Sequence, residues 1–342
     1  MILKRIKNKI ISFIDAKIAI NTSSLFVIYF LNFLISLVTL PHLFKNYGYE
    51  KWGEIVFCQI ILNYLIWIID WSFNQYSSKF ISINNDNLEE QKKIFRETWT
   101  AQLILTLLSL LIIIIISLFT DKYKLIFKLF SLSLIGNFLQ PFWFLNGLEK
   151  IYESAILQLI NKIIFAVLII NLITPNSNKE IYFIIFGISS LISGFIYQLR
   201  LYQNHFEIIG FTSFRKGLRT IKKSSSLYFS MVISSLVNTS LPLIINYYLG
   251  SANLGIYNVA DRIKGICSQL TNPISHSIFP RISKKYNKDK IQGNIFLKQI
   301  IICSLLIILF FYLIINFNIG LIVSFFAKNN NQEIIKILRV LL

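Results

Sequence analysis

Ionisable side chains interrupt the apolar stretches of this 342-residue chain at a few positions. The candidates for a functional role among them are Asp70, Lys162, Asp261, Arg262 and Lys264. Ionisable residues are rare inside a membrane, where they commonly mark substrate or ion pathways. A guanidinium fork matches phosphate oxygens, so Arg262, Lys264 and Lys162 are candidates for contacting an anionic substrate in a cavity. Asp70 and Asp261 are candidate sites for a proton or another cation coupled to transport.

Each of these residues also has a structural interpretation. Arg262 could form an ion pair with its neighbour Asp261, or with Asp70 across a helical bundle. Lys162 could extend its ammonium group to the cytoplasmic interface. Asp70 could cap the end of its helix near the cytoplasm. The residue types alone leave both interpretations open.

Other familiar chemistries are missing from the sequence. The cysteines and histidines are scattered, without the spacing of a metal site or a redox motif. They are Cys58, Cys267, Cys303, His42, His205 and His276. A P-loop, a dinucleotide-binding glycine motif and a nucleophile elbow are all absent from the sequence. We therefore expect no catalytic residue, no cofactor and no metal site, and a transporter rather than an enzyme.

Nine long apolar runs form the elements that must position the candidate residues. They lie near residues 19–40, 55–73, 99–119, 125–146, 154–174, 181–201, 225–249, 254–279 and 297–318. A helix needs about 20 apolar residues to cross the hydrocarbon of a membrane. Charged residues make up 15% of the chain, against roughly 25% in soluble domains. The sequence therefore predicts an all-α integral membrane protein with nine helices and the start of a tenth.

The basic residues are distributed unevenly between the loops. A net charge of +18 would suggest nucleic-acid binding in a soluble protein. Here most of the 34 Lys and Arg residues fall in alternate loops, which is typical of the cytoplasmic side of a membrane. The pattern predicts a cytoplasmic amino terminus and no nucleic-acid partner. Residues 1–18 alternate apolar and basic positions at helical spacing, which predicts an amphipathic segment on the cytoplasmic surface.

The chain contains a faint internal repeat. In each copy an apolar run ends near a Leu-Pro pair, at Pro41 and Pro242, and a short polar hairpin follows. A glycine, Gly53 or Gly255, then opens the next apolar helix. An even number of spans separates the copies, which predicts two parallel bundles facing a central cavity. Chance similarity between two ordinary helical hairpins is the alternative.

The most specific motif is QPFWFLNGLEKI, from Gln140 to Ile151. It resembles the P-x-W-x-x-x-G-x-E signature of bacterial polysaccharide flippases of the Wzx type. The matching residues are Pro141, Trp143, Gly147 and Glu149. The structural alternative is a turn between two spans, in which the tryptophan lies at the membrane interface and the glutamate caps the next helix.

Three further stretches resemble the same family, in the family's order. LGSANLGIYNVADRIKG, which contains Gly255 and Tyr257, resembles the turn into the eighth span. SIFPRISK, which contains Pro280, is similar to the cytoplasmic end of that span. DWSFNQ, at residues 70–75, lies where the family has an acidic residue before Gly-Phe-Asn, with Ser72 in place of the glycine.

The resemblance implies the fold of the multidrug, oligosaccharidyl-lipid and polysaccharide (MOP) exporter superfamily, with about twelve helices in two bundles. The expected divisions are an amphipathic segment (1–18), a six-helix bundle (19–201), a cytoplasmic loop (202–223) and an incomplete, truncated second bundle (224–342). The implied activity is alternating-access transfer of an undecaprenyl-pyrophosphate-linked repeat unit across the bacterial inner membrane, for O-antigen or capsule synthesis. Its implied partners are the polyprenyl-linked oligosaccharide, the lipid bilayer, the polysaccharide polymerase and glycosyltransferases.

Two other functions fit a basic polytopic protein. An integral-membrane polysaccharide polymerase should have large outer loops rich in arginine, whereas the outer loops expected here are short. A drug or organic-cation exporter of the same superfamily should have acidic groups in its cavity, whereas the candidates here are more often cationic. The sequence therefore favours a polysaccharide flippase.

Overall fold

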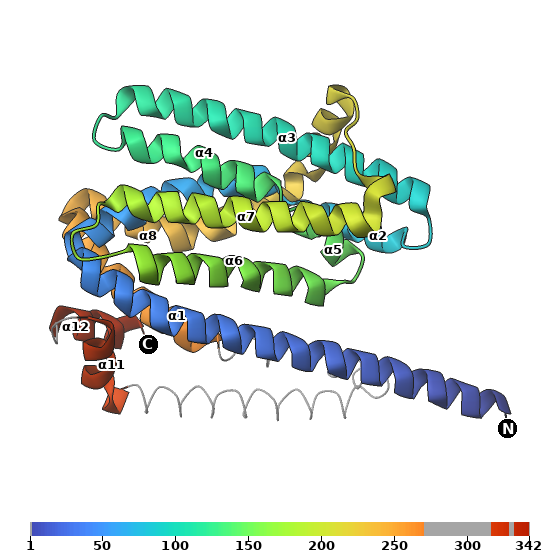
Figure 1. The fold of residues 1–342 in the computed structure, drawn as a ribbon, viewed down its shortest axis with the longest axis horizontal. Coiled ribbons are helices and arrows are strands. Elements are labelled where there is room, and N and C mark those ends of the chain that lie inside the picture. Colours follow the sequence, from blue (N-terminus) through green and yellow to red (C-terminus); the bar gives the residue numbers. More distant parts are fainter. Residues whose placement is uncertain (1, 270–315, 328–331, 342) are drawn as a thin grey trace. The chain divides into compact units, whose positions relative to one another are not determined.

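The computed structural model describes residues 2–269, 316–327 and 332–341, and every element in these ranges is helical. The helices are α1 (Ile2–Asp70), α2 (Phe73–Ile83), α3 (Leu88–Phe119), α4 (Lys124–Phe138), α5 (Phe142–Gly147), α6 (Ile151–Leu172), α7 (Lys179–His205), η1 (Phe206–Ile208), α8 (Phe214–Gln269), α11 (Ile319–Phe326) and α12 (Gln332–Leu341). Figure 1 shows their arrangement. Residues 297–315 of the ninth predicted span, and residues 270–279 of the eighth, lie outside the described residues.

Five helical stretches are long and apolar enough to cross a membrane. They are Phe30–Ile83, Leu88–Phe119, Lys124–Gly147, Ile151–Leu172 and Lys179–His205. A sixth is present if Phe214–Leu236 and Thr239–Gly265, bent by 45°, form one span. The predicted class, an all-α membrane protein, is confirmed. The total of nine to ten spans stays a prediction, as do the boundaries of the two bundles.

The chain folds as two compact units, one made of Met1–Lys45 with Val259–Leu342 and the other of Asn46–Asn258. In the Asn46–Asn258 unit, α3, α4, α7 and α6 lie in a row, each against the next (Figure 1). Small residues allow α4 and α7 to approach closely. A Cβ added to Gly194 would lie 2.9 Å from the carbonyl oxygen of Gly136, an arrangement common between membrane helices.

The other unit is described through α11 and α12, which contact each other. α11 buries Ile319, Val323 and Phe326, and α12 buries Ile334 and Leu338. The buried positions follow helical spacing in both elements, so each presents one apolar face. The residues predicted to form an amphipathic segment are the first turns of α1.

The QPFWFLNGLEKI motif lies in the core of the Asn46–Asn258 unit. Trp143 is only 2% exposed, and its indole N–H donates to Gln102 Oε1 at 2.9 Å. The Tyr197 hydroxyl donates to the Pro141 carbonyl at 2.7 Å. The structure therefore corrects the alternative that placed this tryptophan at the membrane interface. The Trp143 side chain can be buried between helices because its one polar atom, the indole nitrogen, has a hydrogen-bond partner there.

Replacing Gln102 by leucine should leave the Trp143 indole N–H buried without an acceptor. We expect this change to lower the free energy of unfolding by about 1–3 kcal/mol. Thermal unfolding of the detergent-solubilised protein would measure the loss. Gln75→Leu is the matched control, because Gln75 is exposed. Equal unfolding temperatures for the two variants would contradict the role given to this hydrogen bond.

Both copies of the repeat contain a backbone break at glycine. Gly48 interrupts α1 with φ 67° and ψ 176°, and Gly250 interrupts α8 with φ 82° and ψ 173°. A positive φ is readily adopted by glycine because it has no Cβ. Pro41 and Pro242 lie within the helices before these breaks. Each helix therefore continues past its Leu-Pro pair, and the break falls at a glycine within the predicted polar segment.

Candidate transport pocket

The membrane helix that follows Gly48 is interrupted at Asp70. α1 ends at this residue, and α2 begins at Phe73. Between them Trp71 has a φ of 45°, a left-handed conformation that is rare for a bulky residue. Such conformations persist only where surrounding contacts hold them, and they are frequent at functional sites. α1 therefore does end at Asp70, and α2 continues the chain after the break. The position of Asp70 near the cytoplasm stays a prediction.

Contacts with α8 hold this interruption in place. The Trp71 ring stacks on Tyr228, with ring centroids 3.7 Å apart and an angle of 7° between the planes. Its indole N–H donates to the Ile221 carbonyl at 3.2 Å, and Ser72 Oγ donates to the Ser224 carbonyl at 2.8 Å. Ser72 has a φ of −120°. The position where the family has glycine therefore does not require one here, because the left-handed residue is Trp71.

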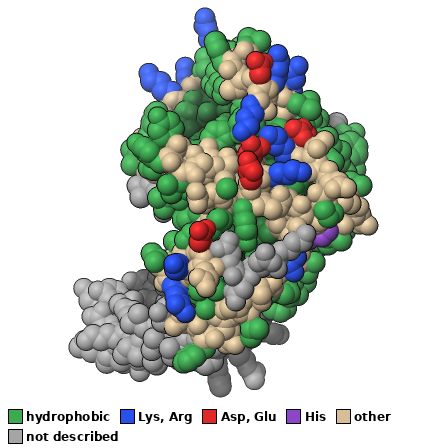
Figure 2. Space-filling view, turned by 90° about the vertical axis from the view of Figure 1, so that its left-hand side faces the viewer, with side chains coloured by type: hydrophobic (Ala, Val, Ile, Leu, Met, Phe, Trp, Pro, Cys, Tyr) green, Lys and Arg blue, Asp and Glu red, His purple; other side chains and the backbone are tan. Residues whose placement is uncertain are grey.

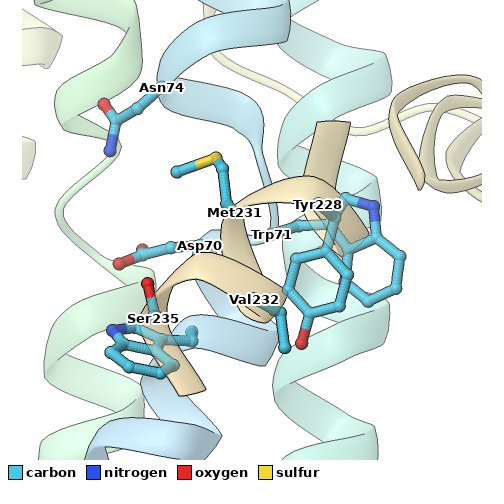
Figure 3. Close-up of a pocket in the computed structure, with 8 residues that line it drawn as sticks. Asp70, Trp71, Asn74, Tyr228, Met231, Val232 and Ser235 are labelled. Carbon is cyan, nitrogen blue, oxygen red and sulfur yellow. The ribbon is translucent and has the colours of Figure 1, made fainter. Parts of the chain in front are cut away.

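A cavity of about 140 Å³ lies at the interruption, between α1 and α8. Its lining residues are Trp67, Asp70, Trp71, Asn74, Tyr228, Met231, Val232 and Ser235. Asp70 and Ser235 lie on one side of the cavity, and the stacked rings of Trp71 and Tyr228 lie on the other (Figure 3). Within the described residues, the Asp70 carboxylate makes no hydrogen bond or ion pair. Its charge is therefore available to a ligand.

The lining chemistry suits two kinds of ligand. Carboxylate, hydroxyl and amide oxygens from Asp70, Ser235 and Asn74 are groups that bind hard cations or sugar hydroxyls. The rings of Trp71 and Tyr228 supply flat faces that attract cations and apolar surfaces. A lone carboxylate inside a membrane is costly while it stays charged and unpaired. Asp70 is therefore favoured to bind a proton or another cation.

Polar contacts also join α1 to α8 away from this cavity. The Tyr64 hydroxyl lies 2.9 Å from Thr239 Oγ1, and the indole N–H of Trp52 donates to Asn258 Oδ1 at 3.1 Å. Later residues of α1 pair with earlier residues of α8, so the two segments run antiparallel. The pairs Trp71–Tyr228 and Tyr64–Thr239 lie on either side of Asp70 in the sequence.

The two repeat-related glycines meet in a reciprocal contact. A Cβ added to Gly53 would overlap the carbonyl oxygen of Ser251, and a Cβ added to Gly255 would overlap the carbonyl oxygen of Tyr49. The backbones of the two copies therefore touch at the same relative position. This contact closes the space between α1 and α8 at the end of the helices where both glycine breaks lie.

An ion cluster stabilises the loops near Gly53. Glu54 accepts from Lys122 at 2.6 Å and from Lys179 at 2.5 Å, which joins α1 to the α3–α4 connection and to the first residue of α7, where the α6–α7 connection ends. The hydrogen bond to Glu54 raises the pKa of Lys122 above its usual range, so this lysine stays charged at physiological pH. Figure 2 looks onto this end of the molecule, where acidic and basic side chains adjoin one another.

Replacing Glu54 by glutamine should release both lysines. We expect faster backbone hydrogen exchange in the α3–α4 and α6–α7 connections, because each loses its charged contact with α1. Glu50→Gln is the matched control, since Glu50 is exposed. Hydrogen exchange followed by mass spectrometry would compare the two variants. Equal exchange in both connections would show that the cluster does not hold them.

The other predicted cavity residues are not brought to this site by the described structure. Lys162 is exposed on α6, within the Asn46–Asn258 unit. Asp261, Arg262 and Lys264 belong to the part of α8 that lies in the other unit. Their roles in binding substrate or a coupling ion stay predictions.

The motif residues have mainly packing roles where the structure describes them. Gly147 lies against α2, where an added Cβ would be 2.7 Å from Ile81 Cβ. Glu149 has a φ of 60° and accepts from Ser82 Oγ at 3.4 Å. α6 has no side-chain cap, which corrects the capping role considered for Glu149. Tyr257 is half-buried on α8, and Pro280 lies outside the described residues.

Sequence reasoning found Asp70 but missed the residues around it. Trp67, Trp71 and Asn74 flank it in sequence, and could have been included as polar and aromatic neighbours. The four α8 residues of the pocket carry a weaker signal, the serine-rich stretch SSSLYFSMVISS within an apolar helix. Only the long-range pairing of α1 with α8 identifies them.

Comparison with known proteins gives the following matches. The family model described as “Polysaccharide biosynthesis protein” matches residues 18–285. A protein of Escherichia coli (strain K12) named “Putative O-antigen transporter” is 26% identical over 283 residues, which cover 81% of this chain and 67% of that protein. A Shigella dysenteriae protein of the same name is 24% identical over 268 residues, covering 77% and 67%. No solved structure matches the chain.

Proposed function

Because this chain belongs to the polysaccharide biosynthesis protein family, we propose that it transports a lipid-linked oligosaccharide across the bacterial inner membrane. The substrate is an undecaprenyl-pyrophosphate-linked repeat unit of O-antigen or capsule. It moves from the cytoplasmic to the periplasmic or outer leaflet, with the amino terminus in the cytoplasm. In this proposal the glycosyltransferases act before this step and the polysaccharide polymerase acts after it.

The observation that carries the proposal is the family match over residues 18–285. The cavity at the interrupted helix supports it as a site for the ion that drives transport. A charged glycan cannot cross hydrocarbon without polar partners, because burying unpaired charge is costly. Interrupted membrane helices commonly form the binding sites of transporters, since they expose polar groups within the membrane. The cavity beside Asp70 combines such an interruption with stacked aromatic rings and a carboxylate that has no ion pair within the described part of the chain.

In this proposal Asp70 binds the proton or cation that drives transport, with Asp261 as a second candidate. Arg262, Lys264 and Lys162 contact the phosphates or sugars of the substrate. Alternating access connects these roles. The reciprocal contact of Gly53 and Gly255 opens to release the glycan and closes again when the cavity returns to the cytoplasmic side.

An organic-cation exporter is the second candidate, and one observation favours it. Among the described residues, the cavity is lined by a carboxylate and three aromatic rings, from Trp67, Trp71 and Tyr228, but by no lysine or arginine. This combination suits an organic cation through charge pairing and cation–π contacts. Transport of ethidium by cells that express the chain would distinguish it from the glycan transporter.

Complementation tests the proposal. The chain would be expressed in an E. coli strain that lacks its O-antigen transporter, and surface polysaccharide would be measured by immunoblot. We expect surface polysaccharide to return and lipid-linked repeat units to decline in the inner leaflet. Normal membrane levels of the chain without any surface polysaccharide would contradict the proposal. Ethidium efflux in the same cells would instead support the exporter.

A further inference from the structure

The beginning of α8 carries a strongly basic surface that the transport pocket does not use. Five basic residues occur within nine positions: Arg215, Lys216, Arg219, Lys222 and Lys223. All five are exposed, and none forms an ion pair within the described residues. The chain has no aspartate or glutamate between Glu207 and Asp261. Glu207 itself pairs with Lys92. The helix therefore leaves these charges unneutralised.

Helical geometry places the five basic residues in two neighbouring rows along one side of α8, which are called the basic ladder below. Arg215, Arg219 and Lys222 are spaced i, i+4 and i+7, so they lie on one face of α8. They span about 10 Å at 1.5 Å per residue. Lys216 and Lys223 form a second row beside the first, at the same i, i+7 spacing.

The opposite face of the same turns fixes the ladder against the protein. A Cβ added to Gly217 would lie 2.9 Å from Ile104 Cδ1 and 3.2 Å from the backbone nitrogen of Ala101. Thr220 and Ser224 are also buried. Because this face packs closely on α3, the basic face is held outward rather than free to turn. The protein therefore presents a preformed row of cations.

Apolar side chains accompany the ladder. Phe214 is 59% exposed and Leu218 is 44% exposed, within the same turns as the basic residues. A helix that exposes cations together with large apolar groups is typical of a membrane interface. Basic clusters next to a membrane helix bind anionic lipid headgroups. Arginine in particular forms paired hydrogen bonds with phosphate oxygens.

We propose that Arg215, Arg219 and Lys222 form a binding surface for the phosphate groups of membrane lipids. The phosphate comes either from an anionic phospholipid or from a polyprenyl diphosphate, since both present the same chemistry at the membrane surface. The proposal for this surface requires only that the start of α8 lies at the membrane surface. It does not require that the chain transports a glycan. In the predicted orientation it faces the inner leaflet.

Native mass spectrometry of the detergent-solubilised chain tests the surface. Phosphatidylglycerol, undecaprenyl diphosphate and phosphatidylcholine would be the probes. Arg219→Gln/Lys222→Gln should weaken binding of the first two by about fivefold for each cation removed. Binding of phosphatidylcholine should change less. A larger loss for phosphatidylglycerol identifies the phospholipid as the ligand, and a larger loss for the diphosphate identifies the polyprenyl carrier.

Lys92→Gln/Lys93→Gln is the matched control. It removes the same charge from α3, but these lysines already pair with Glu89, Glu90 and Glu207. Accessibility of cysteines placed at the exposed positions Asn176 and Asn204 would report whether each variant keeps its orientation. Anionic-lipid binding that is equal in the ladder variant, the control and the parent chain would overturn the proposal.

Discussion

Asp70→Asn is expected to abolish the dependence of transport on an ion gradient while leaving the fold intact. The substitution keeps the shape of the side chain but removes the charge that binds a proton or cation. Charged hydrogen bonds contribute up to about 3 kcal/mol, so cation affinity should fall roughly a hundredfold. Uptake of lipid-linked glycan by reconstituted vesicles, under imposed proton and sodium gradients, would measure the effect.

Asp86→Asn is the matched control for this experiment. Asp86 lies in the exposed turn between α2 and α3, so the same loss of charge occurs outside the cavity. We expect this control to transport like the parent chain. If Asp70→Asn vesicles still respond to the gradient that drives the parent chain, Asp70 is not the coupling residue.

Gly53→Ala and Gly255→Ala should each disrupt the contact between the two repeat copies. The new methyl group would overlap a backbone carbonyl oxygen, at Ser251 or Tyr49. Backbone cannot rotate away as a flexible side chain can, so the helices must separate. Overpacking of this kind costs about 1–3 kcal/mol of stability. Thermal unfolding in detergent would show both variants melting below the parent chain.

Gly265→Ala should have the opposite effect on thermal stability. A Cβ at this position meets no atom of the described residues within 4 Å, and alanine is favoured over glycine in a helix by roughly 0.5–1 kcal/mol. This variant should therefore melt at or above the temperature of the parent chain. A pair of alanine variants at Gly53 and Gly255 that behaves like Gly265→Ala would show that the glycine contact is not needed.

The class of the fold was predictable because it depends on local sequence. A run of apolar residues long enough to span hydrocarbon must form a helix, and the described helices match the predicted runs from α3 to α7. The family was predictable from the Pro141–Glu149 motif, and the family match confirms it. The Leu-Pro repeat also indicated where the two copies correspond, although the break itself falls at Gly48 and Gly250.

The transport pocket was not predictable to the same extent. Asp70 stood out as a carboxylate in an apolar segment, but its neighbours on α8 depend on the register between two distant helices. Sequence periodicity does not fix that register, because both segments are apolar on most faces. The left-handed conformation of Trp71 was equally unpredictable from the sequence. Its left-handed backbone depends on the stack with Tyr228 and the hydrogen bond to Ile221.

The position of Trp71 gives this protein an intrinsic optical probe. The chain has 5 tryptophans, and Trp67 and Trp71 line the same cavity. Phenylalanine at the other three positions would leave fluorescence emission from that cavity alone. Indole emission responds to water, to nearby charge and to a stacked phenol ring. Occupancy beside Asp70 could then be followed in real time without attaching a dye.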